Sequence, residues 1–254
     1  MTDSSVPMEV FALLKAIVST TDGKRPIAPA KQGYSMIPNP ITLADMRSCF
    51  TSAVVCDALD AEGYPRQSPR LAIRPLTGSG VLIGRCRTTL WADMAHPDPR
   101  PYELELLAVD GCKPDDVLIC AASGSLRSGI WGELLSTAAR NSGCVGVVVD
   151  GAVRDVARMR EMSFPVYARE TVIYDSKDRQ RVIDIDVVVE IDGIAFAPGD
   201  LVIADEDGIA VVPQAVELAV VRRAWAKVHA ENEVRDAIRA GMKAVDAFAK
   251  YGVL

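Results

Sequence analysis

The chain has 254 residues, of which 49% are hydrophobic, so it is long enough to bury one large core in one domain or two. Its net charge is −6 and its basic residues are scattered, which gives no electrostatic footprint for phosphate backbones and excludes nucleic acid as an expected direct partner. Six cysteines at irregular spacing, with only two histidines, exclude the usual zinc motifs and predict buried free thiols of a reducing compartment.

The first forty residues differ in composition from the rest of the chain. Met1 to Pro7 lacks the basic-then-apolar layout of a secretory signal, residues 8–19 have helical spacing, and residues 21–40 are rich in Pro, Gly and Lys. No apolar run approaches the roughly 20 residues that span a bilayer. We therefore expect an N-terminal helix and irregular arm over residues 1–40, a main domain over 41–254, and a cytoplasmic protein without a membrane partner.

The main domain alternates predicted helices with predicted strands. Helical spacing and capping signals favour helices at 42–50, 52–62, 102–109, 133–141, 153–162 and 214–240, the last of which closes the chain. Strand signals occur at 77–91, 117–121, 145–149, from 165 onward, and at 182–191, 194–196 and 201–213. The pattern predicts an α/β fold with a long C-terminal helix, whose alanine-rich face is a candidate packing surface for a partner subunit.

The most informative segment begins where a glycine- and serine-rich loop is expected to enter a helix at Gly132. The free backbone N–H groups of that first turn, together with the positive end of the helix dipole, would bind a carboxylate. The alternative is that Gly132 is only a tight turn and that Glu133 is an acid that complements the dipole. Spacing alone leaves both interpretations open.

The same segment continues to Arg154-Asp155, at the predicted start of the next helix. Asp150-Gly151 is expected to end a buried strand just before it, and α/β proteins tend to place ligands beyond strand ends. Arg154 offers a guanidinium fork for a substrate carboxylate, and Asp155 offers a hard oxygen ligand for a divalent ion. A structural Arg–Asp salt bridge that caps the helix explains the pair equally well.

Four motifs, taken in their order and spacing, resemble the RraA-like family, which includes 4-hydroxy-4-methyl-2-oxoglutarate aldolases. They are Gly132-Glu-Leu-Leu135, Gly146-Val-Val-Val-Asp-Gly-Ala-Val-Arg-Asp-Val156, Phe164-Pro-Val-Tyr-Ala-Arg169, and the run from Pro198 to Pro213. The resemblance extends from about Ile41 to the C-terminus. It implies a compact αββα-type, swivelling-domain-like sandwich that assembles as a homotrimer or homohexamer with sites at subunit interfaces.

The resemblance also implies roles for particular residues. In such aldolases the positions that match Gly132, Glu133, Leu134 and Leu135 hold the substrate carboxylate, the position of Arg154 contacts the substrate, and that of Asp155 binds the metal. The chain would then be a class II, metal-dependent aldolase and oxaloacetate decarboxylase for small 2-oxo acids. Mg²⁺ or Mn²⁺ is expected because the candidate ligands are oxygens, and the metal and Arg154 would stabilise a pyruvate enolate.

Further acids are weaker candidates. Glu133 could orient a metal-bound water that carries a proton, and Glu231 or Glu233 of a neighbouring subunit could complete the surroundings of the metal, although solvated helix acids explain the latter two equally well. Arg158 stands where these aldolases often carry an acid, a departure that leaves other 2-oxo acids open as substrates. The family also includes a regulator that inhibits an RNA-degrading endonuclease through protein contacts, and the joint presence of Arg154 and Asp155 favours the enzyme over this non-catalytic alternative.

Overall fold

The computed structural model describes residues 40–70 and 72–252 of a chain that divides into two units, Met1–Met36 and Ile37–Leu254. The helix predicted at residues 8–19 and the arm predicted up to residue 39 lie outside the described residues. The expected domain boundary near residue 41 stays a prediction. Every helix and strand in the described ranges belongs to the second unit.

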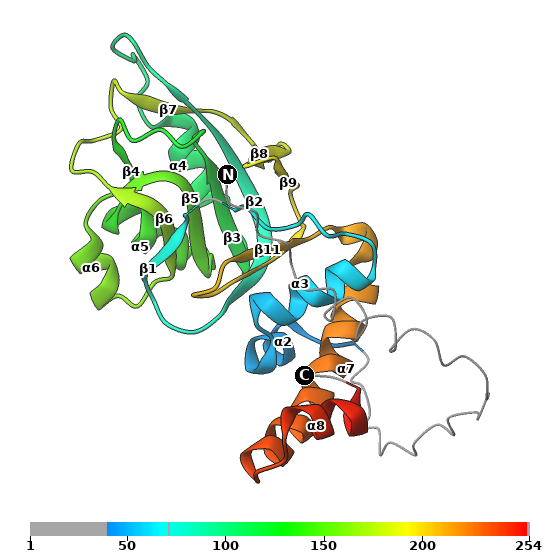
Figure 1. Ribbon diagram of the computed structural model, residues 1–254. Helices are drawn as coiled ribbons and strands as arrows, with labels where there is room; N and C mark the ends of the chain where they lie inside the picture. The colour runs from blue at the N-terminus through cyan, green and yellow to red at the C-terminus, as the bar shows by residue number, and fades with distance from the viewer. Residues whose placement is uncertain (1–39, 71, 253–254) are drawn as a thin grey trace, which may run out of the picture. The chain divides into compact units, whose positions relative to one another are not determined.

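A nine-stranded mixed sheet forms the centre of the second unit (Figure 1). Its main path runs in the order β1 (Arg74–Thr77), β6 (Val166–Thr171), β5 (Gly146–Val153), β3 (Asp116–Ala121), β2 (Leu82–Asp93), β10 (Leu201–Ala204) and β11 (Ile209–Val212). Off this path, β4 (Gly129–Trp131) pairs with β5 and β7 (Gln180–Ile185) pairs with β2. A separate antiparallel ribbon consists of β8 (Val189–Ile191) and β9 (Ile194–Phe196).

Helices cover the sheet in two groups (Figure 1). The first group packs against one face of the parallel strands and consists of α4 (Glu103–Asp110), α5 (Glu133–Asn141) and α6 (Val156–Glu161). The second group packs on β10 and β11 and consists of α2 (Leu43–Cys49), α3 (Ser52–Ala61) and α7 (Glu217–Arg239), with α8 (Ala244–Tyr251) packed on α7. Among the described residues, none of the helices has the length and apolar character needed to cross a membrane.

The alternation of side chains in the central strands explains this layering. Leu118 and Cys120 of β3 belong to the core beneath α4, α5 and α6, whereas Val117 and Ile119 face the β8–β9 ribbon. Successive residues of a strand point to opposite faces, so a strand covered on both faces is apolar throughout. The short apolar runs predicted at 117–121 and 145–149 are therefore confirmed as buried strands.

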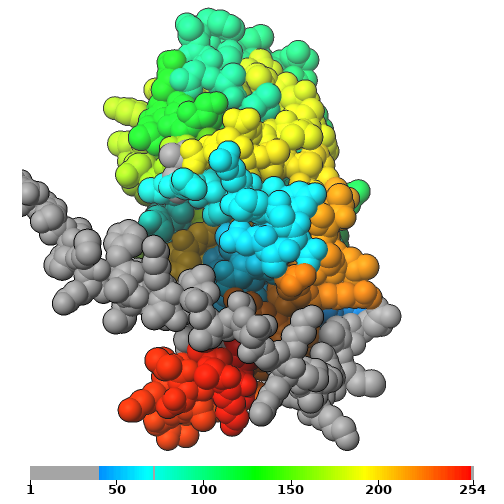
Figure 2. All heavy atoms as spheres, turned by 45° about the vertical axis from the view of Figure 1, so that its right-hand side comes forward, coloured from blue at the N-terminus to red at the C-terminus, as the bar shows by residue number. Residues whose placement is uncertain are grey.

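The sheet face that packs against the β8–β9 ribbon is also covered by the segment that links α3 to β1. The backbone N–H of Arg70 donates to the carboxylate of Asp192 at 2.6 Å, and that of Val211 donates to the carbonyl of Gln67 at 2.9 Å. Figure 2 shows this linking segment (cyan) beside the residues around 180–200 (yellow) on one face. These contacts fix the ribbon between the linking segment and the sheet.

The α/β class and the long C-terminal helix are confirmed, but several predictions about elements are wrong. The strand predicted over 77–91 is interrupted, because Gly78 and Gly80 both have positive φ values and separate β1 from β2. Gly129–Trp131, predicted as part of a loop, forms the short strand β4. The helix that ends at Arg239 does not close the chain, because Gly241 has a φ of 98° and α8 follows it.

The strand after α5 is also longer than predicted. Asp150-Gly151 was expected to end the strand and residue 153 to begin a helix, but β5 continues to Val153 and α6 begins at Val156. The carboxylate of Asp150 is buried inside the strand, where it pairs with Arg169 and accepts a hydrogen bond from the N–H of Gly124. Because this acid is neutralised by a distant arginine, its charge does not interrupt the strand.

Candidate functional site

Two chain segments leave the sheet side by side and carry the candidate site. β4 and β5 are parallel, with Trp131 paired to Val153, so α5 and α6 begin at the same edge of the sheet. Gly132 is the N-cap residue of α5, and Asp155 is the N-cap residue of α6. The N–H of Arg154 donates to the carbonyl of Trp131 at 2.8 Å and ties the two segments together.

Gly132 is required by a close approach and not by a turn. Its φ of −158° and ψ of −168° are extended values that any residue adopts. A Cβ atom added to Gly132 would lie 2.6 Å from Oδ2 of Asp155 and 3.3 Å from Cγ of Arg154. The tight-turn interpretation therefore does not account for this glycine, whose missing side chain leaves the space that the Asp155 carboxylate occupies.

The indole of Trp131 supports this N-terminus from inside the core. Its Nε1 donates to Oγ of Ser136 at 2.8 Å, and that hydroxyl donates to the carbonyl of Gly132 at 2.9 Å. Trp131 and Ser136 are both buried. Trp131, which directly precedes the N-cap residue Gly132, thus supports the first turn of α5 from the core through Ser136.

Asp155 presents a carboxylate to the N-terminus of α5. Its backbone has a φ of 58°, in the left-handed region that residues other than glycine seldom occupy, although Asp tolerates it better than most. The side chain is 46% exposed, and its Oδ2 lies 3.4 Å from the backbone nitrogen of Glu133. The N-cap residue Gly132 has no side chain to cap α5, and the contact from Asp155 reaches only the N–H of Glu133. A half-exposed carboxylate therefore lies at the positive end of a helix dipole, beside free N–H groups.

Arg154 pairs more closely with Asp175 than with its neighbour Asp155. Its Nη2 lies 3.1 Å from Oδ2 of Asp175, whereas its Nε lies 3.9 Å from Oδ2 of Asp155. A simple salt bridge between the adjacent residues thus does not fix this arginine. The side chain is 36% exposed, and within the described ranges its Nη1 donates to no protein group. The guanidinium keeps donors available for a ligand carboxylate.

The rest of the Gly132–Leu135 motif contributes backbone more than side chains. The Glu133 carboxylate accepts a hydrogen bond at 2.9 Å from Oγ1 of Thr137, one turn further along α5. Leu134 is 77% exposed, whereas Leu135 is partly buried against the core beneath the helix. The motif therefore places the N–H groups of one helical turn next to Asp155, while the Glu133 carboxylate is held by Thr137.

Three residues that sequence reasoning missed lie behind Arg154. Asp175 follows β6, and its Oδ1 accepts a hydrogen bond from the hydroxyl of Tyr102 at 2.9 Å. Glu105 lies in α4, whose N-cap residue is Tyr102, and its side chain is 7% exposed. The sequence pattern gave no signal for this cluster, because Tyr102 and Asp175 are about seventy positions apart and nothing in either segment connects them.

The charges of this cluster shift two carboxyl groups in opposite directions. Burial, reinforced by the negative charge of Asp175, raises the pKa of Glu105 to about 8. Partial burial also opposes ionisation of Asp175, but hydrogen bonds from the Lys177 N–H and the Tyr102 hydroxyl, together with the charge of Arg154, hold the pKa of Asp175 below its usual value of 3.8. A protonated Glu105 therefore lies behind an ionised Asp175 at neutral pH.

The two acids predicted on the last long helix are not near this cluster within one chain. Glu231 forms ion pairs with Lys227 and Arg235 along α7, and Glu233 is exposed. Figure 1 shows α7 away from α5 and α6. A contribution of these acids to the site of a neighbouring subunit stays a prediction.

Arg158 lies on the exposed surface of α6. It forms an ion pair with Glu161 at 3.3 Å, and both side chains are largely solvated. The departure from the aldolase pattern at Arg158 therefore places a solvated cation one turn beyond Asp155.

A shallow pocket adjoins the candidate site. It has a volume of about 340 Å³ and is lined by residues 153–156 and by Thr171, Val172 and Ile173. Its wall is therefore mostly apolar, apart from Arg154, Asp155 and Thr171, so a small organic ligand held at the two charged residues would contact carbon on its other side.

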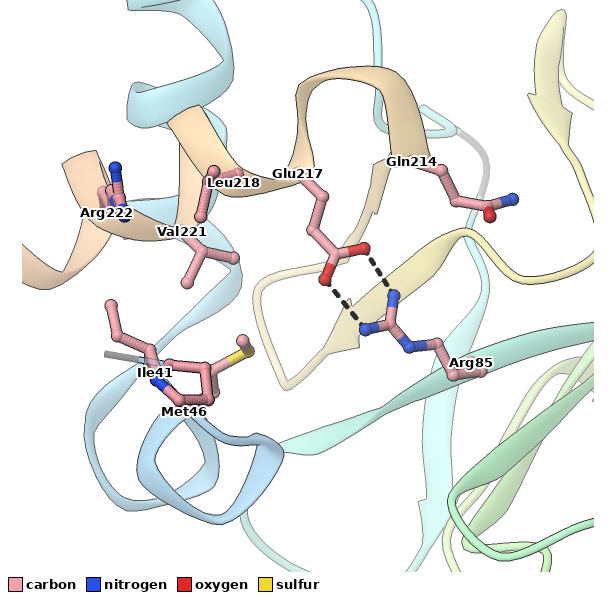
Figure 3. A pocket seen from close by; sticks show the side chains of 9 residues that line it. Ile41, Met46, Arg85, Gln214, Glu217, Leu218, Val221 and Arg222 are labelled. Atoms are coloured by element: carbon pink, nitrogen blue, oxygen red, sulfur yellow. Dashed lines mark hydrogen bonds and ion pairs between the residues drawn. The ribbon is translucent and has the colours of Figure 1, made fainter. Parts of the chain in front are cut away.

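A larger pocket of about 390 Å³ lies elsewhere, between α2, β2 and α7 (Figure 3). Its charged pair consists of Arg85 and Glu217, whose Nη1–Oε2 and Nη2–Oε1 distances are 2.5 and 2.8 Å. Figure 3 shows the two side chains facing each other along both contacts, beside apolar side chains such as Met46 and Val221. Because each charge satisfies the other, we place the candidate site at Arg154 and Asp155 despite its smaller pocket.

The fold and the paired helix N-termini define an α/β protein with a candidate site at the ends of parallel strands, and the comparisons with known proteins make the class specific. The model of the RraA-like family, described as Aldolase/RraA, matches residues 52–211. A protein of Halalkalibacterium halodurans, provisionally named 4-hydroxy-4-methyl-2-oxoglutarate aldolase, is 32% identical over 177 residues, which cover 69% of this chain and 80% of that protein. The chain belongs to the RraA-like family.

Other relatives show the same relationship with different coverage. Protein DlpA of Legionella pneumophila is 28% identical over 212 residues, which are 84% of this chain but only 34% of that protein. The structure of an uncharacterised protein of Pseudomonas syringae matches with a TM-score of 0.73 at 25% identity, over 88% of this chain and 100% of that one. Streptomyces coelicolor RraAS2, described as an unusual member of the RNase ES inhibitor RraA protein family, matches with a TM-score of 0.65 at 30% identity, over 73% and 91%.

Proposed function

We propose that this chain is a divalent-metal-dependent carbon–carbon lyase for small 2-oxo acids, resembling 4-hydroxy-4-methyl-2-oxoglutarate aldolase and able to decarboxylate oxaloacetate. The observation that carries the proposal is the meeting of the Asp155 carboxylate, the Arg154 guanidinium and the N-terminus of α5 at one edge of the sheet. The aldolase name of the Halalkalibacterium halodurans relative supports the same reaction class.

Substrate binding is assigned to the first turn of α5 and to Arg154. The free N–H groups of Leu134 and Leu135, beside the Glu133 N–H that donates to Asp155, point out of the helix N-terminus, where they would bind the carboxylate of a 2-oxo acid. Arg154 would pair with the oxygen on which negative charge develops as the carbon–carbon bond breaks. Such electrostatic stabilisation acts most strongly on the transition state, because the charge is largest there.

Asp155 fits a hard divalent cation such as Mg²⁺ or Mn²⁺. Its carboxylate is half-exposed, and among the described residues no hydrogen bond reaches its Oδ1. Within the same residues, no three His, Cys, Asp or Glu side chains gather as a metal site, so water and substrate oxygens would complete the coordination, which Mg²⁺ accepts. When bound, the ion would polarise the substrate carbonyl as a Lewis acid.

The aldol cleavage needs a group that accepts a proton. The 4-hydroxyl proton of the substrate must leave as the bond between carbons 3 and 4 breaks, the C4 carbonyl forms, and the bonding pair passes to the pyruvate enolate. We assign the transfer of that proton to Glu133, directly or through a water molecule, since it is the first residue of α5 and its carboxylate is held by Thr137. Decarboxylation of oxaloacetate forms the same enolate without this proton loss, and protonation at carbon 3 completes both reactions.

Apolar side chains around the site support assembly with sites at subunit interfaces. Leu134 is 77% exposed, and Ile173, in the wall of the adjoining pocket, is 86% exposed. Large exposed apolar groups next to a functional site are typical of a surface that another chain covers. We therefore extend the proposal to a homotrimer or homohexamer, in which Glu231 or Glu233 of a neighbouring subunit reaches the site.

The test is protein-dependent release of pyruvate from oxaloacetate and from 4-hydroxy-4-methyl-2-oxoglutarate, with Mg²⁺ or Mn²⁺ and again with excess chelator. Background decarboxylation by the metal alone is subtracted. We expect pyruvate from the wild-type protein only with metal, and none above background from Arg154→Ala or Asp155→Ala. The control variant is Asp246→Ala, which removes an exposed acid in the first turn of another helix.

Each outcome of this assay has a definite meaning. Full activity in Asp155→Ala or Arg154→Ala would refute the site assignment, and activity retained in chelator would refute the metal requirement. Absence of pyruvate from both substrates with the wild-type protein would refute the proposed reaction and favour the regulator, for which a protein partner would be sought.

A further inference from the structure

Arg154 has a carboxylate on each side. The contact with Asp175 is the shorter one, at 3.1 Å from Nη2, while Oδ2 of Asp155 lies 3.9 Å from Nε. The guanidinium is a single cation. When it pairs with Asp175, the Asp155 carboxylate remains free to bind a metal. The contacts made by Asp175 therefore bear directly on the site proposed above.

Asp175 is well fixed to act on Arg154. Its Oδ1 accepts hydrogen bonds of 2.9 Å from the Tyr102 hydroxyl and 2.9 Å from the N–H of Lys177, so its Oδ2 is left for the guanidinium. Donors on one oxygen fix the plane of the carboxylate and thereby the direction of the ion pair. Asp175 is thus a rigid partner for Arg154.

The loop that carries Asp175 is fixed as well. The guanidinium of Arg179 donates to the carbonyl of Asp175 at 3.1 Å and lies 5.2 Å from the centre of the Tyr174 ring. The carbonyl of Tyr174 accepts a hydrogen bond of 2.8 Å from the N–H of Gly129, the first residue of β4. The position of Asp175 is therefore tied to the same short strand that leads into α5.

Tyr102 has an unusual backbone that places its hydroxyl on Asp175. Its φ is 70° and its ψ is 0°, a left-handed conformation that bulky residues rarely adopt. Tyr102 is the N-cap residue of α4, yet its side chain makes no capping hydrogen bond and reaches across to the β6–β7 loop instead. A strained backbone that is retained at such a contact points to a functional constraint.

We propose that Asp175, held by Tyr102, is a positioning residue that draws the Arg154 guanidinium away from Asp155, keeping the Asp155 carboxylate free for the metal and the remaining donors of Arg154 free for the substrate. This inference rests on the proposed function of the site. Without the charge of Asp175, the guanidinium moves onto Asp155, so metal binding weakens even though Asp175 touches no metal.

The test is the binding of Mn²⁺ to the full-length protein, measured from the signal of free Mn²⁺ by electron paramagnetic resonance. We expect Asp175→Asn to weaken Mn²⁺ binding about three- to fivefold, the upper range for losing one partly exposed ion pair. Tyr102→Phe is expected to weaken it about twofold, since it removes one neutral hydrogen bond behind that pair. The KM for oxaloacetate is expected to rise in the same order.

A double variant separates positioning from a general effect on folding. In Arg154→Ala/Asp175→Asn the competing guanidinium is gone, so Mn²⁺ binding is expected to return to the wild-type value or above it, although turnover is lost. The matched control is Asp178→Asn in the same loop, whose carboxylate accepts the N–H of Asp98 at 2.8 Å. This control is expected to leave Mn²⁺ binding unchanged.

The outcomes for this inference and for the proposed function are distinct. If wild-type protein binds Mn²⁺ and Asp175→Asn binds it equally well, or if Asp178→Asn weakens binding as much as Asp175→Asn does, the positioning role is overturned while the proposed function stands. Failure of the double variant to regain binding also overturns the positioning role alone. If wild-type protein binds no Mn²⁺, the metal-dependent function is overturned, and this inference with it.

Discussion

Two arginines of this protein contact carboxylates beside a pocket, and they differ in how completely they are paired. Arg85 meets both oxygens of Glu217 with both of its terminal nitrogens, and this pairing raises the pKa of Arg85 further (Figure 3). Arg154 makes one short contact, with Asp175, and a longer one with Asp155. The first arrangement leaves little for a ligand to bind, whereas the second leaves donors and a half-free carboxylate.

A choice of site by pocket volume alone would favour Arg85 over Arg154. The pocket beside Arg85 is the larger of the two, at about 390 Å³ against about 340 Å³ beside Arg154. The pair of Arg85 and Glu217 nevertheless has a structural role, because a ligand could bind to either side chain only by displacing the other. Incomplete pairing next to a helix N-terminus is therefore the better indicator of a site in this protein.

The largest expected difference between the two arginines is in catalysis. Lys cannot reproduce the guanidinium fork, so Arg154→Lys is expected to lower kcat/KM for oxaloacetate about 100- to 1000-fold, the range seen when one transition-state donor is removed. Arg85→Lys is expected to change kcat/KM less than about twofold, because among the described residues the Arg85 guanidinium bonds to Glu217 and to a backbone carbonyl and not to the candidate site. Equal losses in the two variants, measured by pyruvate release, would contradict the comparison.

A methyl group at Gly132 tests the close approach of Asp155. The added Cβ would lie 2.6 Å from Oδ2 of Asp155, so Gly132→Ala is expected to displace that carboxylate and lower metal-dependent turnover about 10- to 100-fold. Gly208→Ala is the control, since its Cβ would meet nothing closer than Oγ of Ser68 at 3.9 Å. Normal Mn²⁺ binding by Gly132→Ala would show that the carboxylate does not need that space.

The buried Glu105 behind Arg154 should appear in the pH dependence of stability. Its pKa is about 8 in the folded protein and near 4.5 in the unfolded chain, so its contribution to stability is complete below about pH 4.5 and is lost as the pH rises through 8. One pKa unit corresponds to about 1.4 kcal/mol, and we expect wild-type protein to lose about 1–3 kcal/mol more than Glu105→Gln between pH 5 and pH 8. Urea unfolding at both pH values measures this difference, and parallel curves would contradict the assignment.

The smallest expected effect is a loss of stability when the ion pair between Arg85 and Glu217 is broken. Glu217→Gln removes the charge from a partly exposed ion pair and is expected to lower the free energy of unfolding by about 1 kcal/mol at pH 7. Pyruvate release is expected to stay at the wild-type rate. A loss of activity without a loss of stability would mean that the pocket in Figure 3, and not only the one at Arg154, takes part in function.

The sequence predicted those parts of the fold and site that depend on local pattern. Val117 to Ala121 forms a strand because apolar residues are buried on both of its faces, and a helix begins after Gly132 as its position in the motif indicated. The pairing of β4 with β5, which brings Gly132 next to Arg154-Asp155, was not predicted, because β4 was expected to be loop. The end of β5 could not be predicted in this way. Asp150-Gly151 has the composition of a turn, and the ion pair with Arg169, on another strand, together with the hydrogen bond from the N–H of Gly124 allows that acid to be buried.

The contacts behind Arg154 could not be predicted for the same reason. Tyr102, Asp175 and Arg154 are far apart in the chain, and their meeting depends on how α4 and the β6–β7 loop pack together. A turn-like segment such as Tyr174-Asp175-Ser176 occurs in many loops without any such role. Helix α8 was not predicted, because the helix expected at residues 214–240 was expected to close the chain.

The tryptophan that precedes Gly132 gives this protein a built-in optical reporter. Trp131 is buried, and its indole N–H is linked through Ser136 to the carbonyl of Gly132, one peptide from the N–H groups assigned to the ligand. A ligand that settles on that turn changes the electric field at the indole, so the emission of Trp131 should follow site occupancy without any added dye. With Trp91 and Trp225 replaced by Phe, one titration in a fluorimeter would record binding even for a molecule that the protein does not convert.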